Sequence, residues 1–189
     1  MISDKNMLKE FRPSFLFLGK FLAIYFVFNI IYGIYVESYG AKADGITWWI
    51  SGQTVSILQS MGYDAGTRAH DIDPKIVLLN GSNIVVNLFE GCNGINIMIL
   101  FMAFIIAFSG KIKVMIWFIP AGFLFIHLAN LARIVLLYWV YEDKPDYMYF
   151  THKYLFTAVI YGAIFLLWII WVLKFSKLKR LKIKIKTIQ

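Results

Sequence analysis

The apolar positions of this chain fall in long uninterrupted blocks, not in the alternating or 3.6-residue patterns of half-buried strands and helices. Four blocks are expected to form transmembrane helices, at about residues 14–36, 93–110, 112–141 and 154–173. A hydrocarbon layer of about 30 Å needs roughly 20 helical residues, which is close to the length of these blocks. The pattern therefore predicts an all-α integral membrane protein with about four transmembrane helices, which form a single domain over residues 1–189.

The stretch between the first two blocks, about residues 37–91, is the only sizeable region expected outside the membrane. Thr47–Met61 contains two adjacent tryptophans, Trp48 and Trp49, and is predicted to be a helix lying at the membrane surface. Two short runs that favour strands follow, Ile76–Leu79 and Ile84–Phe89, and the residues between them begin with Asn-Gly. Asn-Gly is a strong hairpin signal, so a short β-hairpin is expected directly before the second transmembrane helix.

Composition supports the membrane assignment. Hydrophobic residues make up 60% of the chain and charged residues 16%, whereas an ordinary soluble domain has about 45–50% apolar residues. A soluble globular protein is thereby excluded. The first block follows three basic residues, as in a signal peptide, but its apolar run is too long and has no small-residue cleavage site, so we expect a retained anchor.

The net charge of +8 points to a membrane surface and not to nucleic acid. Seven Lys and Arg residues lie between Lys174 and Lys186, directly after the last apolar block, so 174–189 is expected to be a basic cytoplasmic tail. Four crossings then place the N-terminus and the tail on the same side, and the outer segments carry most of the acidic residues. Both ends are therefore expected in the cytoplasm.

Three residues capable of chemistry are expected at one depth in the membrane. The single cysteine, Cys92, excludes an intrachain disulfide and a zinc site built from several thiolates. At about 1.5 Å per helical residue, Cys92, Arg133 and His152 each lie roughly 28–33 Å from the nearest cytoplasmic lysine along their helices. A thiol, a guanidinium and an imidazole are therefore predicted in one layer near the outer face. No metal and no cofactor are expected.

These residues could form a catalytic site or a structural polar cluster. A thiolate is a nucleophile, and its pKa falls near cations and at helix N-termini. Asn93 is a plausible N-cap for the second helix, Gly94 allows a close backbone approach, and Asn130 could orient Arg133. The alternatives remain open: a lone membrane cysteine is usually a packing residue, and the chain could be a non-catalytic assembly subunit or a transport subunit.

Together the motifs resemble those of the exosortase and archaeosortase family. EGCNGIN at Glu90–Asn96 opens one predicted membrane helix, ANLARIVLL at Ala129–Leu137 lies in the next, and His152 opens another. The family's Cys-(Ser/Asn)-Gly, Asn-x-x-Arg and His positions match Cys92–Gly94, Asn130–Arg133 and His152. With only one helix before the cysteine, this chain looks more like the compact branch of the family described in Bacteroidetes.

The resemblance implies a cysteine protease and transpeptidase of the bacterial inner membrane, with its active site facing the periplasm. Its substrates are expected to be membrane-anchored exported proteins whose C-terminal sorting signal combines a short motif, a membrane helix and a basic cluster. Cys92 would attack the scissile carbonyl at the periplasmic face and form an acyl-thioester, which water or an amine would resolve. Arg133 and His152 would divide proton donation and transition-state stabilisation between them, in an order that the sequence leaves open.

Overall fold

The computed structural model describes residues 4–108, 110–147 and 156–175. In order along the chain, the elements are α1 (Asp4–Glu37), α2 (Gly45–Ser60), β1 (Ala65–Ala69), β2 (Ile76–Asn80), β3 (Asn83–Leu88), η1 (Glu90–Cys92), α3 (Ile95–Ala107), α4 (Ile112–Asp143), η2 (Pro145–Tyr147), α6 (Phe156–Ile170) and η4 (Trp171–Phe175). The protein is therefore mostly helical, with one small sheet. Among the described residues, three helices are long and apolar enough to cross a membrane: Phe11–Glu37, Ile112–Asp143 and Ala158–Phe175.

The second predicted membrane helix is shorter than expected. Residues 93–110 were expected to be helical, but α3 covers only Ile95–Ala107, which is about 20 Å at 1.5 Å per residue. The chain enters α3 through a 3-10 turn, Glu90–Cys92, and through Gly94, whose φ of +82° cannot continue an α-helix. Because residues 90–94 form the loop that carries Cys92, α3 is too short, by its length alone, to cross a membrane.

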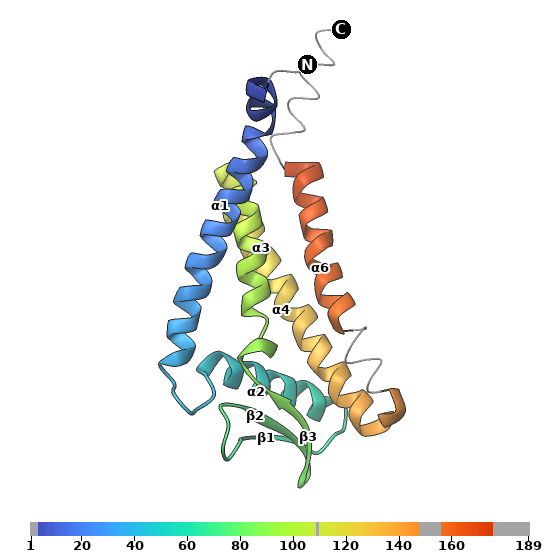
Figure 1. Cartoon of the computed structure of the whole chain (residues 1–189). Helices are drawn as coiled ribbons and strands as arrows, with labels where there is room; N and C mark the ends of the chain where they lie inside the picture. The colour runs from blue at the N-terminus through green and yellow to red at the C-terminus, as the bar shows by residue number, and fades with distance from the viewer. Residues whose placement is uncertain (1–3, 109, 148–155, 176–189) are drawn as a thin grey trace.

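Figure 1 shows four helices, α1, α3, α4 and α6, running alongside one another, with α2 lying across one end of them. The beginning of α1 and the end of α6 lie at the opposite end from α2 and the sheet. We call these the helix end and the sheet end of the molecule. The predicted surface helix is present, although it begins at Gly45 because the side chain of Asp44 accepts the backbone N–H groups of Ile46 and Thr47.

The sheet has one strand more than the predicted hairpin. β2 and β3 pair antiparallel, with Asn80 opposite Asn83 and Gly81 at a φ of +56° in the turn, so the Asn-Gly signal is confirmed. β1 pairs antiparallel with β2 from Ala65↔Asn80 to Ala69↔Ile76. The sequence of β1, AGTRA, has almost none of the β-branched and aromatic residues that mark a strand, and pairing with β2 is what makes it one.

Two hydrophobic clusters hold these elements together. At the sheet end, buried residues of α2, the three strands and the last part of α4 pack around Leu58, Leu78 and Tyr138, each 0% exposed. At the helix end, α3, α4, α6 and η4 pack around Phe101, Ile105 and Trp171. Cys92 lies against the first cluster, so the predicted site belongs to the sheet end.

Candidate functional site

Cys92 lies in a short loop between the sheet and α3. After β3 ends at Leu88, the chain makes the turn η1, and the backbone N–H of Cys92 donates to the carbonyl of Phe89 at 2.8 Å. The loop then passes through Gly94, where an added Cβ would lie 3.3 Å from the side chain of Asn130. Positive φ and this close approach together require glycine, so the Gly94 prediction of a tight backbone approach agrees with the structure.

Helix α4 supplies two side chains to this loop. Asn130, 0% exposed, donates from Nδ2 to the carbonyl oxygen of Cys92 at 2.9 Å. One turn later, Arg133 donates from Nη1 to Oδ1 of Asn130 at 3.4 Å. The amide of Asn130 therefore joins the guanidinium of Arg133 to the backbone that carries the thiol. This i, i+3 spacing is the sequence signal that predicted an orienting role for Asn130.

Two opposing influences set the pKa of the Cys92 thiol. Burial, and to a smaller extent the negative charge of Glu90, raise the pKa above its ordinary value, while a backbone hydrogen bond at Phe89, the positive charge of Arg133 and a side-chain hydrogen bond with Arg133 lower it. Burial outweighs the others, so the net shift is upward. The sequence suggested that cations and a helix N-terminus would lower the pKa; the cation is in place, but burial of the thiol was not visible in the sequence.

Asn93 is buried beside Cys92 and makes contacts that the sequence did not reveal. The predicted N-cap role is wrong in detail, because the N-cap position of α3 is Gly94, although Oδ1 of Asn93 still accepts the backbone N–H of Ile95 at 3.0 Å. Its Nδ2 donates to the hydroxyl of Tyr32 at 2.6 Å and to that of Thr47 at 3.3 Å. A buried amide bonded on both sides fixes the loop to α1 and α2.

The network continues to Asp44, which is 2% exposed. The hydroxyl of Thr47 donates to Oδ2 of Asp44 at 2.5 Å. Sequence reasoning missed Tyr32, Asp44 and Thr47 as neighbours of the site. An Asp three residues before a Thr at a helix start does signal an N-cap, but nothing in the sequence shows that the same threonine faces the Cys92 loop.

His127 holds α2 against α4. Its Nε2 lies 2.7 Å from Oε1 of Gln53, and its ring stacks on Trp49 with the centroids 4.9 Å apart. Both contacts join the two helices, so the histidine has a structural role.

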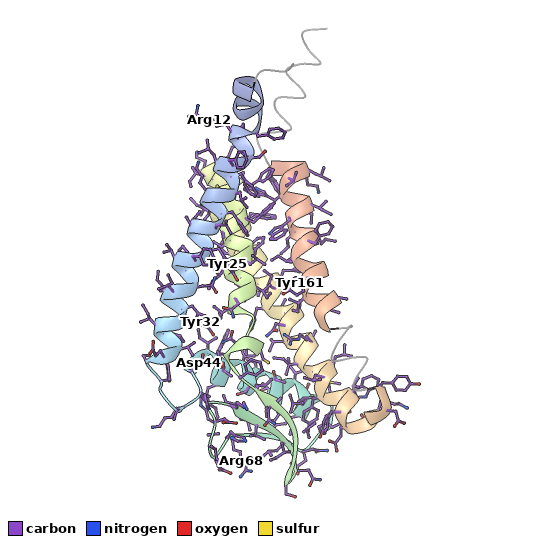
Figure 2. The ribbon with its side chains drawn as sticks, viewed as in Figure 1. Arg12, Tyr25, Tyr32, Asp44, Arg68 and Tyr161 are labelled. Carbon is purple, nitrogen blue, oxygen red and sulfur yellow. The ribbon has the colours of Figure 1, made fainter. Side chains whose placement is uncertain are left out.

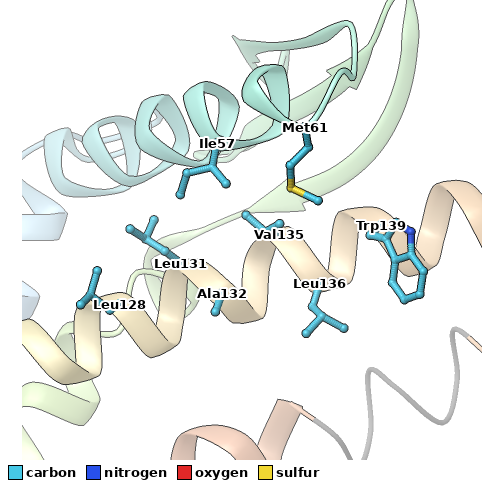
Figure 3. A pocket seen from close by; sticks show the side chains of 8 residues that line it. All are labelled: Ile57, Met61, Leu128, Leu131, Ala132, Val135, Leu136 and Trp139. Carbon is cyan, nitrogen blue, oxygen red and sulfur yellow. The ribbon is translucent and has the colours of Figure 1, made fainter.

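An apolar groove lies between α2 and α4 at the sheet end of the molecule. Its volume is about 500 Å³, and Figure 3 shows Ile57 of α2 and Met61, directly after α2, facing Leu131 and Val135 of α4 across it. Leu131 belongs to the hydrophobic cluster at the sheet end, and Val135 and Cys92 both pack against that cluster. The groove therefore adjoins the packing around the thiol.

The structure thus brings together Cys92, Asn93, Gly94, Asn130 and Arg133. The remaining predicted residue, His152, lies outside the described residues. Within residues 4–108, 110–147 and 156–175, no group of three or more His, Cys, Asp and Glu side chains is placed so that it could hold a metal ion.

No family model, no curated protein and no solved structure matches the chain significantly.

Proposed function

We propose that the chain is a membrane-embedded cysteine protease and transpeptidase of the exosortase type, which removes C-terminal sorting signals from exported proteins. The observation that carries the proposal is that three motif residues lie in contact. The side-chain amide of Asn130 is hydrogen-bonded to the backbone of Cys92 and to Arg133, and Arg133 lowers the pKa of the thiol. The motifs come from segments about 40 residues apart in the sequence. Convergence of a thiol and a guanidinium is what acyl transfer requires.

In the proposed reaction, Sγ of Cys92 bonds to the scissile carbonyl carbon as its proton passes to His152. The carbonyl oxygen becomes an oxyanion, which Arg133 stabilises because a guanidinium keeps its proton at all working pH values. The C–N bond then breaks, and the leaving amine takes the proton from His152. Attack by water or by an acceptor amine on the thioester releases the product and returns the proton to the thiol.

The location belongs to the same proposal. Four helices, α1, α3, α4 and α6, cross the inner membrane, with the sheet end in the periplasm and the basic residues from Lys174 onward in the cytoplasm. The apolar groove between α2 and α4 faces the outer leaflet and receives the apolar segment of the substrate. A short α3 suits this arrangement, because the Cys92 loop then occupies the outer part of the layer where a substrate helix ends.

A non-catalytic membrane assembly or transport subunit is the second candidate. The observation that favours it is the burial of Cys92, which packs against an apolar cluster and has a raised pKa. A neutral buried thiol is typical of a structural cysteine. In that case Cys92→Ser, which keeps size and polarity, leaves the phenotype intact.

The two candidates separate in a co-expression experiment. The protein is produced with tagged proteins of the same genome that end in an apolar helix followed by Lys and Arg, and tail removal is followed by immunoblot and intact mass. We expect the wild type to remove the tail of its substrate, and Cys92→Ala, Cys92→Ser and His152→Ala to leave the tail in place while inserting normally. Tail removal by Cys92→Ser at the wild-type rate would contradict the protease proposal.

A further inference from the structure

We propose that Tyr32, Thr47 and Asp44 are positioning residues, which hold the Cys92 loop so that the thiol stays within reach of Arg133. This inference rests on the proposed function in one respect only, the use of Cys92 as the nucleophile. The three residues act on the loop through Asn93: Tyr32 and Thr47 accept hydrogen bonds from its side chain, and Asp44 accepts the hydroxyl of Thr47.

The directions of the hydrogen bonds follow from the chemistry of the groups. A hydroxyl has a single proton to donate, and that of Thr47 goes to Oδ2 of Asp44. The oxygen of Thr47 is then left to accept, and Nδ2 of Asn93 is the donor that it receives. Asp44 thereby determines which way the amide of Asn93 faces.

The other hydrogen of Nδ2 goes to the hydroxyl of Tyr32, whose own proton points to the carbonyl of Glu90 at 3.5 Å. Figure 2 places Tyr32 at the end of α1 nearest α2, close to Asp44 at the start of α2. Asn93 is 1% exposed, Thr47 2% and Asp44 2%. Little water reaches Asn93, Thr47 and Asp44, so a lost bond leaves a buried polar group unsatisfied.

The peptide between Cys92 and Asn93 is consequently held from two sides. Asn130 of α4 binds the carbonyl of Cys92, and α1 and α2 bind the side chain of Asn93. Arg133 extends from the same helix as Asn130. If the hydrogen bonds from Asn93 to Tyr32 and Thr47 are lost, the loop keeps its hydrogen bond to Asn130 but can rotate about it. The distance from the thiol to the guanidinium is then no longer fixed.

Because Cys92 is the only cysteine, its reactivity can be measured without ambiguity in the full chain. The protein is reconstituted in lipid nanodiscs, and the rate of alkylation by N-ethylmaleimide is followed by intact mass across pH. The informative quantity is the factor by which Arg133→Gln slows alkylation near pH 8, measured in the wild type and again in Thr47→Val and in Tyr32→Phe. A shift of one pKa unit corresponds to about a tenfold change in thiolate below the pKa.

We expect Arg133→Gln to slow alkylation about tenfold in the wild type and by less than about threefold in either network variant. Thr47→Ser, which keeps the hydroxyl, restores the wild-type factor. Two matched controls keep the full Arg133 factor. In Thr54→Val the lost hydroxyl is hydrogen-bonded to the Ile50 carbonyl of its own helix, and Tyr25→Phe lies on α1 nearer the helix end than Tyr32 (Figure 2).

An unchanged Arg133 factor in both Thr47→Val and Tyr32→Phe overturns the proposal, even if both variants are less stable. The assay uses no substrate, so its failure is distinct from a failure of tail removal. If Thr47→Val does not fold, Tyr32→Phe, which removes a single hydroxyl from a half-buried side chain, decides the question alone.

Discussion

A hydrophobic cluster packs each end of this protein, but the sheet end also has side-chain hydrogen bonds between elements, and the helix end has stacked aromatic rings. At the sheet end, side-chain hydrogen bonds join separate elements, as between Tyr138 and the Leu79 carbonyl at 3.0 Å or between Asn80 and Glu142 at 2.9 Å. At the helix end, aromatic rings do the packing, as in the stacked pair Phe104 and Trp168 with centroids 4.4 Å apart.

The difference indicates where precise chemistry is possible. A hydrogen bond fixes distance and direction, whereas aromatic packing tolerates small displacements. Polar groups are also costly to bury in a membrane, so a cluster of them calls for a function or a structural need. Cys92, Asn130 and Arg133 lie at the end where geometry is fixed.

The largest expected effect comes from removing the positive charge of Arg133, which lies beside Cys92. Arg133→Gln is expected to slow tail removal by about 10²–10³-fold, the usual loss when one oxyanion-stabilising donor is removed. Arg68→Gln, at an arginine of β1 (Figure 2), is the matched control and is expected to be near wild type. Processing rates from pulse-chase immunoblots measure both, and equal rates for Arg133→Gln and the wild type would remove Arg133 from the mechanism.

The helix end is tested by overpacking. A Cβ at Gly122 would lie 2.3 Å from Cζ of Phe101, so Gly122→Ala is expected to destabilise the fold by about 1–3 kcal/mol. Gly162→Ala meets nothing within 4 Å and is the control. Thermal unfolding in nanodiscs gives the stability, and Cys92 alkylation at pH 8 in the folded variant is expected to match the wild type. A large change in alkylation by Gly122→Ala would show that the two ends are not independent.

The groove between α2 and α4 offers a third test. Ala132→Phe fills part of the groove, and we expect tail removal to slow by about tenfold, the equivalent of 1.4 kcal/mol of substrate binding. Ala121→Phe adds the same volume at an exposed position of α4 that does not line the groove. Intact mass of the substrate measures both variants, and equal slowing by the two would mean that the groove has no special role.

The smallest effect is expected at an exposed hydrogen bond of the sheet end. Tyr63 donates to Oδ2 of Asp143 at 2.5 Å, and this bond, followed by burial, raises the pKa of Tyr63 to about 12. Because the bond is exposed, Tyr63→Phe is expected to cost well under about 1 kcal/mol at neutral pH.

The pH dependence of this small contribution has a definite sign. The folded-state pKa is above the unfolded value of about 10, so the stabilisation is complete below that pH and is lost as pH rises toward 12. Urea unfolding of the wild type and Tyr63→Phe is expected to differ by a constant amount from pH 7 to about 9 and to converge above it. A difference that grows with pH would contradict the assignment.

The sequence predicted the apolar helices and the hairpin because both depend on local pattern. Long apolar blocks predict α1, α4 and α6, and Asn80-Gly81 predicts the turn between β2 and β3. β1 and the short α3 escaped prediction for physical reasons. β1 is a strand only through its pairing with β2, and the length of α3 is set by a loop geometry that depends on Gly94 and Asn130.

At the site, helical spacing was enough to predict that Asn130 could orient Arg133 and that Arg133 lies near Cys92. It was not enough to predict the burial that raises the pKa of the thiol, because burial depends on how α2 and the sheet pack over the loop. Tyr32 and Thr47 are 61 and 46 residues from Asn93, and such long-range contacts leave no local signal.

The most direct test of the central claim is a search for a thioester on the peptide that contains Cys92. The wild-type protein is isolated from cells that express its substrate, treated with trypsin at mildly acidic pH, and analysed by mass spectrometry with and without neutral hydroxylamine. The account predicts an acyl adduct on Cys92 that hydroxylamine removes and that Cys92→Ala lacks. Tail removal that proceeds in Cys92→Ala, with no adduct in the wild type, would contradict it.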